Sequence, residues 1–407
     1  MKKLILNEGY ANLNAYFEKG IGAKIKIKNK YYFDLSNCAG SIVLGHSNQV
    51  FKKLLRNIIN KNISNFAYPN IYSAKLAALI CKKIKNIKKI IFCNSGTEAV
   101  IKSLRISRAI NTKKKVVSVS GSWHGSVDQL LYSPNEQLIP KQLSDGLVPN
   151  EKKNLIFIPY NDIDKSRKIL DKNKKNINCI IIEPIQGALP LKDNKKYLKF
   201  LESYSKKNKI ILIFDEIITA FRVNKFSVQN KYKINPDITT LGKICGGGLP
   251  IGIIGINKKI EKKLQKKKIF YGGTFSGNSI NTYIGYETLQ YILKNKKITQ
   301  NINKKSKYFE YELNNFFSKF KFNAKIYRHD SILRIVFSKK VLKNRSARDF
   351  VEKKYYKKIN LLRKFLYKKQ ILYPTSGIIF LSYNLSLKDV DYIIMQIKNG
   401  FKSIFKI

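Results

Sequence analysis

The sequence is poor in the residue types that build metal centres and disulfide frameworks. Its 407 residues include three histidines and five cysteines, and no two cysteines form a CxxC pair. So few histidines exclude a histidine-rich metal site, and we predict no metal. An odd number of scattered cysteines is typical of a reducing cytoplasm rather than of a secreted chain.

Long apolar runs are also missing. No stretch approaches the roughly 20 apolar residues that a membrane helix needs. The N-terminal sequence MKKLILNEGY holds an apolar run of three residues, which is too short for a signal peptide. We therefore expect a soluble, cytoplasmic protein with no membrane partner.

Acidic residues are scarce, with 26 Asp and Glu against 79 Lys and Arg, and the net charge is +53. Such a balance is found in proteins that bind nucleic acid or anionic membranes. Here the lysines run from Lys2 to Lys406 rather than along one tail, and they accompany many Asn, Ile and Tyr residues with A/T-rich codons. Compositional drift is the simpler explanation, so no specific nucleic acid is predicted. A non-enzymatic polyanion-binding protein stays as an alternative.

The chain contains enough apolar residues to form the cores of two or three structural units. Hydrophobic residues make up 44% of it and aromatic residues 12%. Short apolar runs alternate with amphipathic segments such as 97–110 and 194–208, which predicts an α/β fold with a mostly parallel sheet covered on both faces. The expected strands are 89–93, 115–120, 154–160, 178–184, 209–216, 237–242 and 251–257.

The pattern changes near residue 290. Long helices over 298–320 and 346–369 frame short strands over 331–338 and 377–383, which predicts a smaller α+β domain. Near the N-terminus a hairpin is expected over 23–35, with its turn near Asn29 and Lys30. We expect three parts: residues 1–50, packing with the small domain; residues 51–292, the large domain; and residues 293–407, the small domain.

Polar residues follow the predicted strands, at the edge where open α/β sheets bind ligands. Ser95, Gly96 and Thr97 open a helix whose free N–H groups and positive dipole end suit a phosphate, although an ordinary helix N-cap explains them too. Trp123, the only tryptophan, and His124 stand in a loop between two glycines. The indole suits stacking on a flat ring, with a purely structural tryptophan as the alternative.

Carboxylates end two of the most apolar strands, at Glu183 and at the pair Asp215 and Glu216. Desolvated carboxylates need cationic or N–H partners. A metal site or structural ion pairs, one of them with Arg222, are alternatives for an isolated pair, and no histidine near them in sequence supports a metal.

Lys243 follows another apolar strand and precedes three consecutive glycines, whose missing side chains let the backbone approach a ligand closely. A lysine in a dry pocket loses proton affinity and can form a Schiff base with an aldehyde. A phosphate cup, an aromatic side chain, a buried carboxylate and such a lysine together fit pyridoxal phosphate.

Six segments together resemble the class III pyridoxal-phosphate aminotransferases, and most closely their glutamate-1-semialdehyde 2,1-aminomutase branch. They are NSGTEAV, GSWHGS, IIEPIQG, LIFDEIITAFRV, PDITTLGKICGGGLPIG and GGTFSGN. Their order and spacing match from about residue 30 to residue 290. The resemblance implies fold type I, a large pyridoxal-phosphate-binding domain around a mostly parallel seven-stranded sheet, and a homodimer with shared active sites.

The resemblance also implies a role for each residue. Lys243 would carry the cofactor as a Schiff base and act as acid and base, and Asp215 would pair with the ring nitrogen. Trp123 and Ile218 would contact the ring, with His124 and Glu183 in support. The phosphate would be held by Ser95, Gly96 and Thr97, joined by Thr274 of the second subunit.

The substrate side departs from the aminomutase pattern. No arginine precedes Arg56, although the aminomutases bind the substrate carboxylate with an arginine from this segment. Ala39 and Gly40 are the residues expected to contact the substrate, and Ala39 replaces the aminomutases' bulky tryptophan. Their C-terminal Phe-Glu pair is missing. Arg328 and Arg334 are the remaining candidates for a carboxylate. We therefore predict an aminotransferase that moves an amino group from an amine donor to a carbonyl acceptor through a pyridoxamine form of the cofactor. Intramolecular aminomutase chemistry is the alternative.

Overall fold

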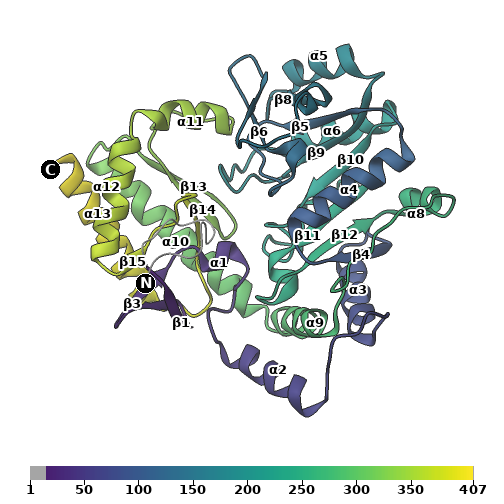
Figure 1. Ribbon diagram of the computed structural model, residues 1–407. Coiled ribbons are helices and arrows are strands. Elements are labelled where there is room, and N and C mark those ends of the chain that lie inside the picture. Colours follow the sequence, from purple (N-terminus) through teal and green to yellow (C-terminus); the bar gives the residue numbers. More distant parts are fainter. Residues whose placement is uncertain (1–14, 407) are drawn as a thin grey trace.

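The computed structural model describes residues 15–406, so the N-terminal MKKLILNEGY lies outside the described part (Figure 1). A seven-stranded sheet forms the centre of the larger lobe, in the order β4-β12-β11-β10-β9-β5-β8. Strand β12 runs antiparallel to both its neighbours, whereas the pairs from β11 to β8 are parallel. The predicted mostly parallel sheet is confirmed. Its strands are β4 (Lys89–Cys93), β5 (Lys115–Val119), β8 (Leu155–Ile158), β9 (Ile177–Ile182), β10 (Ile211–Asp215), β11 (Ile238–Gly242) and β12 (Gly252–Ile256).

Helices cover both faces of this sheet because successive strand residues point to opposite sides. Ile180 and Ile182 of β9 pack with α5 (Ile163–Asn173) and α6 (Lys195–Lys207). Cys179 and Ile181 pack on the other side, with α4 (Gly96–Ile110). At the β12 end, α3 (Ile71–Lys83) and α9 (Ser279–Lys294) complete the layer.

The N-terminal and C-terminal parts of the chain share a second core. In a four-stranded sheet, β15 (Ile371–Leu372) pairs in parallel with β3 (Lys30–Asp34). Phe33 and Leu35 are buried in the same cluster as the C-terminal helices. The domain boundaries themselves stay a prediction. This lobe contains β1 (Phe17–Ile21), β2 (Lys24–Ile27), β13 (Lys325–His329), β14 (Ile332–Val336), β16 (Ile378–Phe380), α10 (Lys297–Lys319), α11 (Arg345–Lys353), α12 (Tyr356–Lys368) and α13 (Leu387–Phe405).

The expectation of one helix over 346–369 is wrong, because α11 and α12 are separate helices. Helix α11 contacts loops of the larger lobe through Arg345 and Ser346, whereas α12 buries Leu362 and Leu366 in the C-terminal core. One straight helix cannot make both sets of contacts. The remaining α-helices and strands are α1 (Asn37–Gly40), α2 (Gln49–Asn60), β6 (Tyr132–Pro134), β7 (Pro140–Gln142), α7 (Val228–Tyr232) and α8 (Lys258–Leu264).

None of the described helices is long and apolar enough to cross a bilayer.

Candidate active site

A cavity of about 390 Å³ opens at the carboxyl ends of the central strands, where parallel sheets bind ligands. It brings together residues from segments as far apart in the sequence as Cys38 and Ile251. Most of the predicted site residues line it: Ser95, Gly96, Thr97, Trp123, His124, Glu183, Asp215, Ile218 and Lys243.

The N-terminus of α4 forms one wall. Ser95 is the N-cap, and its hydroxyl accepts a hydrogen bond of 3.1 Å from the N–H of Glu98. The N-cap interpretation is therefore correct, and it is compatible with the phosphate prediction, since the first N–H groups of a helix have no intrahelical acceptor. Gly252 of β12 lets the backbones approach, because a Cβ there would lie 1.9 Å from the carbonyl oxygen of Ser95.

Asp215 ends β10 and lies buried in a hydrogen-bond network. One carboxylate oxygen lies 2.7 Å from Nδ1 of His124. The other accepts from the hydroxyl of Thr240 at 3.0 Å and from the N–H of Ile217 at 3.2 Å. Thr240 is a residue that the sequence analysis missed, and its only signal is a polar residue inside the apolar strand β11. The Nε2 atom of His124 is buried and has no partner among the described residues.

Glu183 is the second buried carboxylate of the cavity, and it accepts a hydrogen bond of 2.8 Å from the N–H of Trp123. Burial raises the pKa of Glu183 to about 7, and the nearby charge of Asp215 acts in the same direction. Glu216 lies outside the cavity and accepts N–H bonds from Val228 and Gln229. It is a structural carboxylate and forms no ion pair with Arg222.

Lys243 follows β11 directly and has a left-handed backbone, with φ of 48°. Its Nζ donates a hydrogen bond of 3.0 Å to the carbonyl of Ala39. Burial lowers the pKa of Lys243, and the charge of Arg222 lowers it further. Both effects favour the neutral, nucleophilic amine.

Arg222 and the turn 37–40 form a further part of the site. The sequence analysis named Ala39 and Gly40 of this turn, but it gave Arg222 only as a possible ion-pair partner and did not identify Asn37 and Cys38. Asn37, Cys38, Ala39 and Gly40 all have positive φ, and strained backbone of this kind clusters at functional sites. Arg222 is 4% exposed and donates to the carbonyl of Gly40. The predicted substrate residues Ala39 and Gly40 therefore lie beside Lys243, while Cys38 and Ser41 line the cavity itself.

Three predicted residues lie away from the cavity. Thr274 is exposed in the loop between α8 and α9, and does not line the cavity of its own chain. Arg328 pairs with Glu310, and Arg334 pairs with Glu352. Neither arginine lines the cavity, so neither can bind a substrate carboxylate there in this conformation.

The donor set fits pyridoxal phosphate. The cavity offers free helix N–H groups for a phosphate and the Asp215 carboxylate for a ring nitrogen. The buried, unpartnered Nε2 of His124 is a further polar group that a ligand can satisfy. Trp123, 41% exposed, and the aliphatic Ile218 are suited to a flat ring, and Lys243 supplies the amine.

Sequence comparison agrees with this fit. Residues 5–360 match the sequence model of the family "Aminotransferase class-III". A glutamate-1-semialdehyde 2,1-aminomutase of Thermodesulfovibrio yellowstonii is 31% identical over 396 residues, covering 96% of this chain and 92% of the relative. The protein of the same name from Archaeoglobus fulgidus is 36% identical over 288 residues, covering 69% and 68%.

Solved structures share the fold at low sequence identity. An ω-transaminase from Sphaerobacter thermophilus superposes with a TM-score of 0.90 at 19% identity, covering 97% of this chain and 92% of its own. A glutamate-1-semialdehyde aminomutase from Pseudomonas aeruginosa in complex with PMP gives a TM-score of 0.86 at 16% identity, covering 96% and 88%.

Proposed function

Because the chain belongs to the class III aminotransferases, which are pyridoxal-phosphate enzymes, we propose that it transfers an amino group from an amine donor to a carbonyl acceptor. The observation that carries the proposal is the meeting of Lys243, Asp215 and the N-terminus of α4 in one cavity. When bound, pyridoxal phosphate supplies an aldehyde for the amine and a ring that withdraws electrons from the substrate carbon.

Each residue of the chain has a distinct task in this proposal. Lys243 holds the cofactor and, once released, carries a proton at Nζ between the reacting carbon atoms. Asp215 keeps a positive charge on the ring nitrogen, and His124 and Thr240 fix its carboxylate. Ser95, Gly96 and Thr97 bind the phosphate through backbone N–H groups and hydroxyls. Trp123 and Ile218 exclude water from the ring, and Glu183 positions the Trp123 loop.

Intramolecular amino transfer is the second candidate. It is favoured by relatives named glutamate-1-semialdehyde 2,1-aminomutase at 31–37% identity. Against it stand the small Ala39 in place of a bulky tryptophan and the absence of any arginine from the cavity lining of the described residues.

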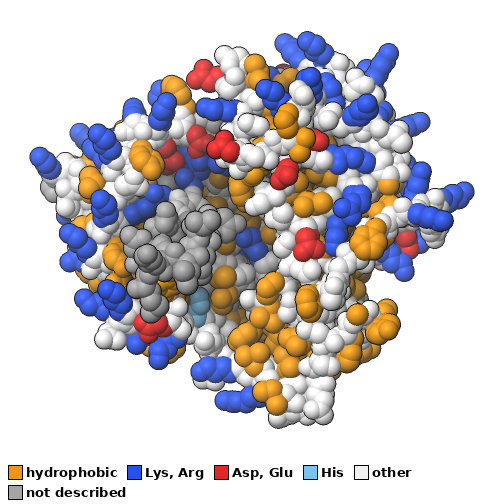
Figure 2. Space-filling view, in the orientation of Figure 1, with side chains coloured by type: hydrophobic (Ala, Val, Ile, Leu, Met, Phe, Trp, Pro, Cys, Tyr) orange, Lys and Arg blue, Asp and Glu red, His pale blue; other side chains and the backbone are white. Residues whose placement is uncertain are grey.

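We further propose that the protein is a homodimer and that it is located in the cytoplasm. The dimer is supported by Figure 2, which shows hydrophobic side chains gathered over the region of α2 and α9. Soluble monomers rarely expose large apolar patches. Thr274 lies in the same loop as Phe270 and Phe275, which suits a residue that completes the second subunit's phosphate site. All five cysteines are unpaired, as in a reducing compartment. The exposed large apolar residues in and beside these helices are Leu55 and Ile59 on α2, Phe66 and Tyr68 in the loop after it, Ile71 at the start of α3, and Phe270 and Phe275 in the loop before α9.

The test is a half-reaction followed by visible absorption. Single amine donors are added to the cofactor-loaded enzyme, and then single carbonyl compounds. Bleaching by an amino acid, with recovery on adding a keto acid, supports the transferase. Bleaching only by a diamine or an amino aldehyde, without need of an external acceptor, supports the mutase. An enzyme that holds no cofactor contradicts both.

A further inference from the structure

A second cavity adjoins the active site at Trp123. It has a volume of about 480 Å³ and lies between the β6–β7 hairpin and α11. Trp123 lines both this cavity and the active-site cavity, so the two spaces adjoin at this residue. A substrate that extends past Trp123 therefore enters the second cavity.

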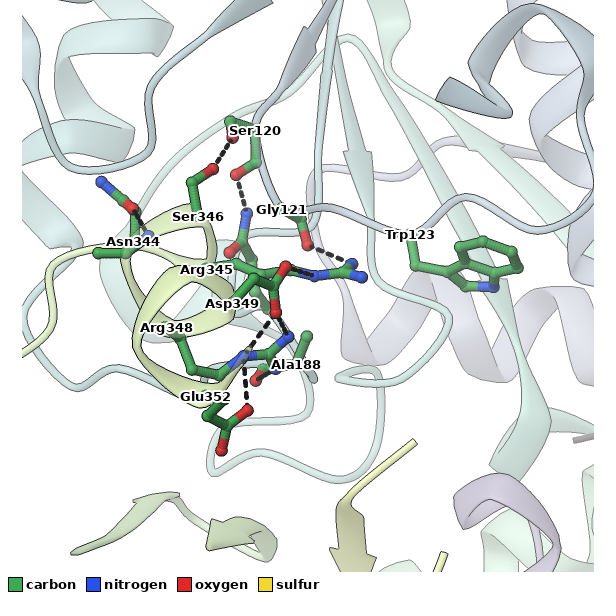
Figure 3. A network of polar contacts seen from close by, with 12 residues as sticks. Ser120, Gly121, Trp123, Ala188, Asn344, Arg345, Ser346, Arg348, Asp349 and Glu352 are labelled. Carbon is green, nitrogen blue, oxygen red and sulfur yellow. Dashed lines mark hydrogen bonds and ion pairs between the residues drawn. The ribbon is translucent and has the colours of Figure 1, made fainter. Parts of the chain in front are cut away.

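The first turn of α11 is fixed against the loop that carries Trp123 (Figure 3). The hydroxyl of Ser346 lies 2.9 Å from that of Ser120, and Arg345 Nη1 donates to the carbonyl of Gly121 at 3.3 Å. Gly121 permits this approach, because a Cβ there would lie 2.6 Å from the Cβ of Arg345. Arg348 adds a bond to the carbonyl of Ala188. These contacts fix the side chains of the first turn of α11 beside the loop that carries Trp123.

Arg345 is the cationic side chain that this turn of α11 places nearest to Trp123. In Figure 3 its guanidinium points from α11 toward Trp123. Nε contacts the carboxylate of Asp349 at 3.2 Å, and Asp349 also pairs with Arg348. The side chain of Arg345 is 31% exposed, and its Nη2 has no acceptor in the described part of the chain. A half-buried guanidinium whose Nη2 N–H groups are free is suited to a carboxylate or a phosphate.

The rest of the cavity lining suits the body of an organic molecule. Lys141 and Lys353 add positive charge, against the carboxylates of Asp349 and Glu136. Besides Trp123, the apolar and aromatic lining residues are Leu130, Tyr132, Pro134, Leu143, Phe157 and Phe350. Ligand sites commonly combine such a surface with a few placed polar groups.

We propose that this cavity is a distal substrate subsite, in which Arg345 binds an anionic group remote from the reacting carbon. The inference rests on the proposed function and assigns it a substrate class: an amine or carbonyl compound with a carboxylate or phosphate at its far end. It also accounts for the lack of an arginine in the active-site cavity, since the anion is bound beyond Trp123 instead.

The test uses Trp123, the only tryptophan of the chain, as the reporter. Butyl phosphate, pentanoate and uncharged butanol are titrated into the cofactor-loaded enzyme at constant ionic strength, and tryptophan fluorescence is recorded. A saturable change is expected with the anions and none with butanol. Arg345→Met weakens anion binding by about tenfold or more. Asp349→Asn tightens it, because a competing carboxylate is removed. The probe that binds more tightly identifies the anion as carboxylate or phosphate.

Three results overturn the subsite. These are no saturable change with either anion, unchanged affinity in Arg345→Met, or equal weakening in both variants, which indicates only a disturbed α11. Failure of the proposed function is seen separately, as a wild-type enzyme that forms no visible cofactor band. An enzyme with that band whose Arg345→Met variant still binds the anions refutes the subsite alone.

Discussion

Replacing Arg222 with methionine separates the stability of the fold from the chemistry of Lys243. Arg222 lies 4% exposed between three segments of the chain. It donates to the carbonyl of Gly40 and to the hydroxyl of Ser331, and its guanidinium lies 4.5 Å from the ring centroid of Phe380. No carboxylate pairs with it among the described residues. Its charge therefore acts mainly on the strained turn 37–40 and on Lys243.

The effect on stability is expected to be small, because two large terms oppose each other. Burial lowers the pKa of Arg222 from 12.5 to about 9, which corresponds to roughly 5 kcal/mol for keeping the cation charged at neutral pH. Two hydrogen bonds from a charged donor contribute about 1.5–3 kcal/mol each, and a desolvated cation–π contact about 2 kcal/mol. Methionine removes both the cost of burying the charge and the favourable contacts of the guanidinium. We therefore expect a loss in unfolding free energy of at most about 3 kcal/mol.

The effect on Lys243 is expected to be clear. Burial and the charge of Arg222 both lower the pKa of Lys243, and the substitution removes the second cause. The pKa then rises, so less of the neutral amine is present at a given pH. The assay mixes cofactor-free enzyme with pyridoxal phosphate across a pH series and follows the visible band. We expect the pH of half-maximal capture rate to shift upward in Arg222→Met.

Arg222→Lys is the matched control, because it keeps the charge but cannot reach Gly40 and Ser331 together. Its capture profile should stay near that of the wild type. An unchanged profile in Arg222→Met, with the fold intact, would refute the electrostatic effect. A loss of unfolding free energy far above 3 kcal/mol in denaturant titration would refute the balance of terms.

Three further predictions test the phosphate wall, the buried carboxylate of Glu183 and the proposed dimer interface. Gly252→Ala places a Cβ 1.9 Å from the carbonyl oxygen of Ser95, so the N-terminus of α4 must move. We expect the affinity for pyridoxal phosphate, measured by spectroscopic titration, to fall by about tenfold or more. An unchanged affinity would contradict the role of α4 in binding the phosphate. Burial raises the pKa of Glu183 from 4.5 to about 7, so between these pH values the folded state keeps a proton on this carboxyl that the unfolded state has lost. The unfolding free energy of the cofactor-free enzyme therefore falls by roughly 3 kcal/mol as the pH rises from 4.5 to above 7. Glu183→Gln should flatten that slope in denaturant titrations at several pH values, and an unaltered slope would count against a buried carboxylate. Ile59 and Tyr68 are 74% and 79% exposed, and we expect Ile59→Asp and Tyr68→Asp to convert the dimer to a monomer in light scattering and to weaken cofactor retention. Tyr311→Asp, at an exposed residue on α10 in the other lobe, is the control. If the Ile59 and Tyr68 variants stay dimeric, the proposed interface is wrong.

The sequence predicted the central sheet and the chemistry at its edge because both depend on local pattern. Strands such as β9 and β10 are nearly continuous apolar runs. Asp215 ends β10, Lys243 directly follows β11 and Ser95 comes two residues after β4, so their positions at the sheet edge follow from the chain order. A mostly parallel sheet then brings these strand ends together.

The rest depends on contacts between distant segments. Nothing in the sequence near Arg222 indicates that it reaches Gly40, 182 residues away. The break between α11 and α12 contains no proline or glycine, and it follows from the docking of α11 on the loops of Ser120 and Gly121. Arg328 and Arg334 were reasonable candidates for an anion, but their ion pairs with Glu310 and Glu352 come only from the folded arrangement.

The central claim is that Lys243 holds pyridoxal phosphate covalently, and borohydride reduction followed by peptide mass spectrometry tests it most directly. After reduction of the cofactor-loaded enzyme, the account predicts a reduced-cofactor mass increment on the peptide that contains Lys243, and no such increment in Lys243→Ala. An unmodified Lys243 peptide, or an increment on another lysine that persists in Lys243→Ala, would contradict it.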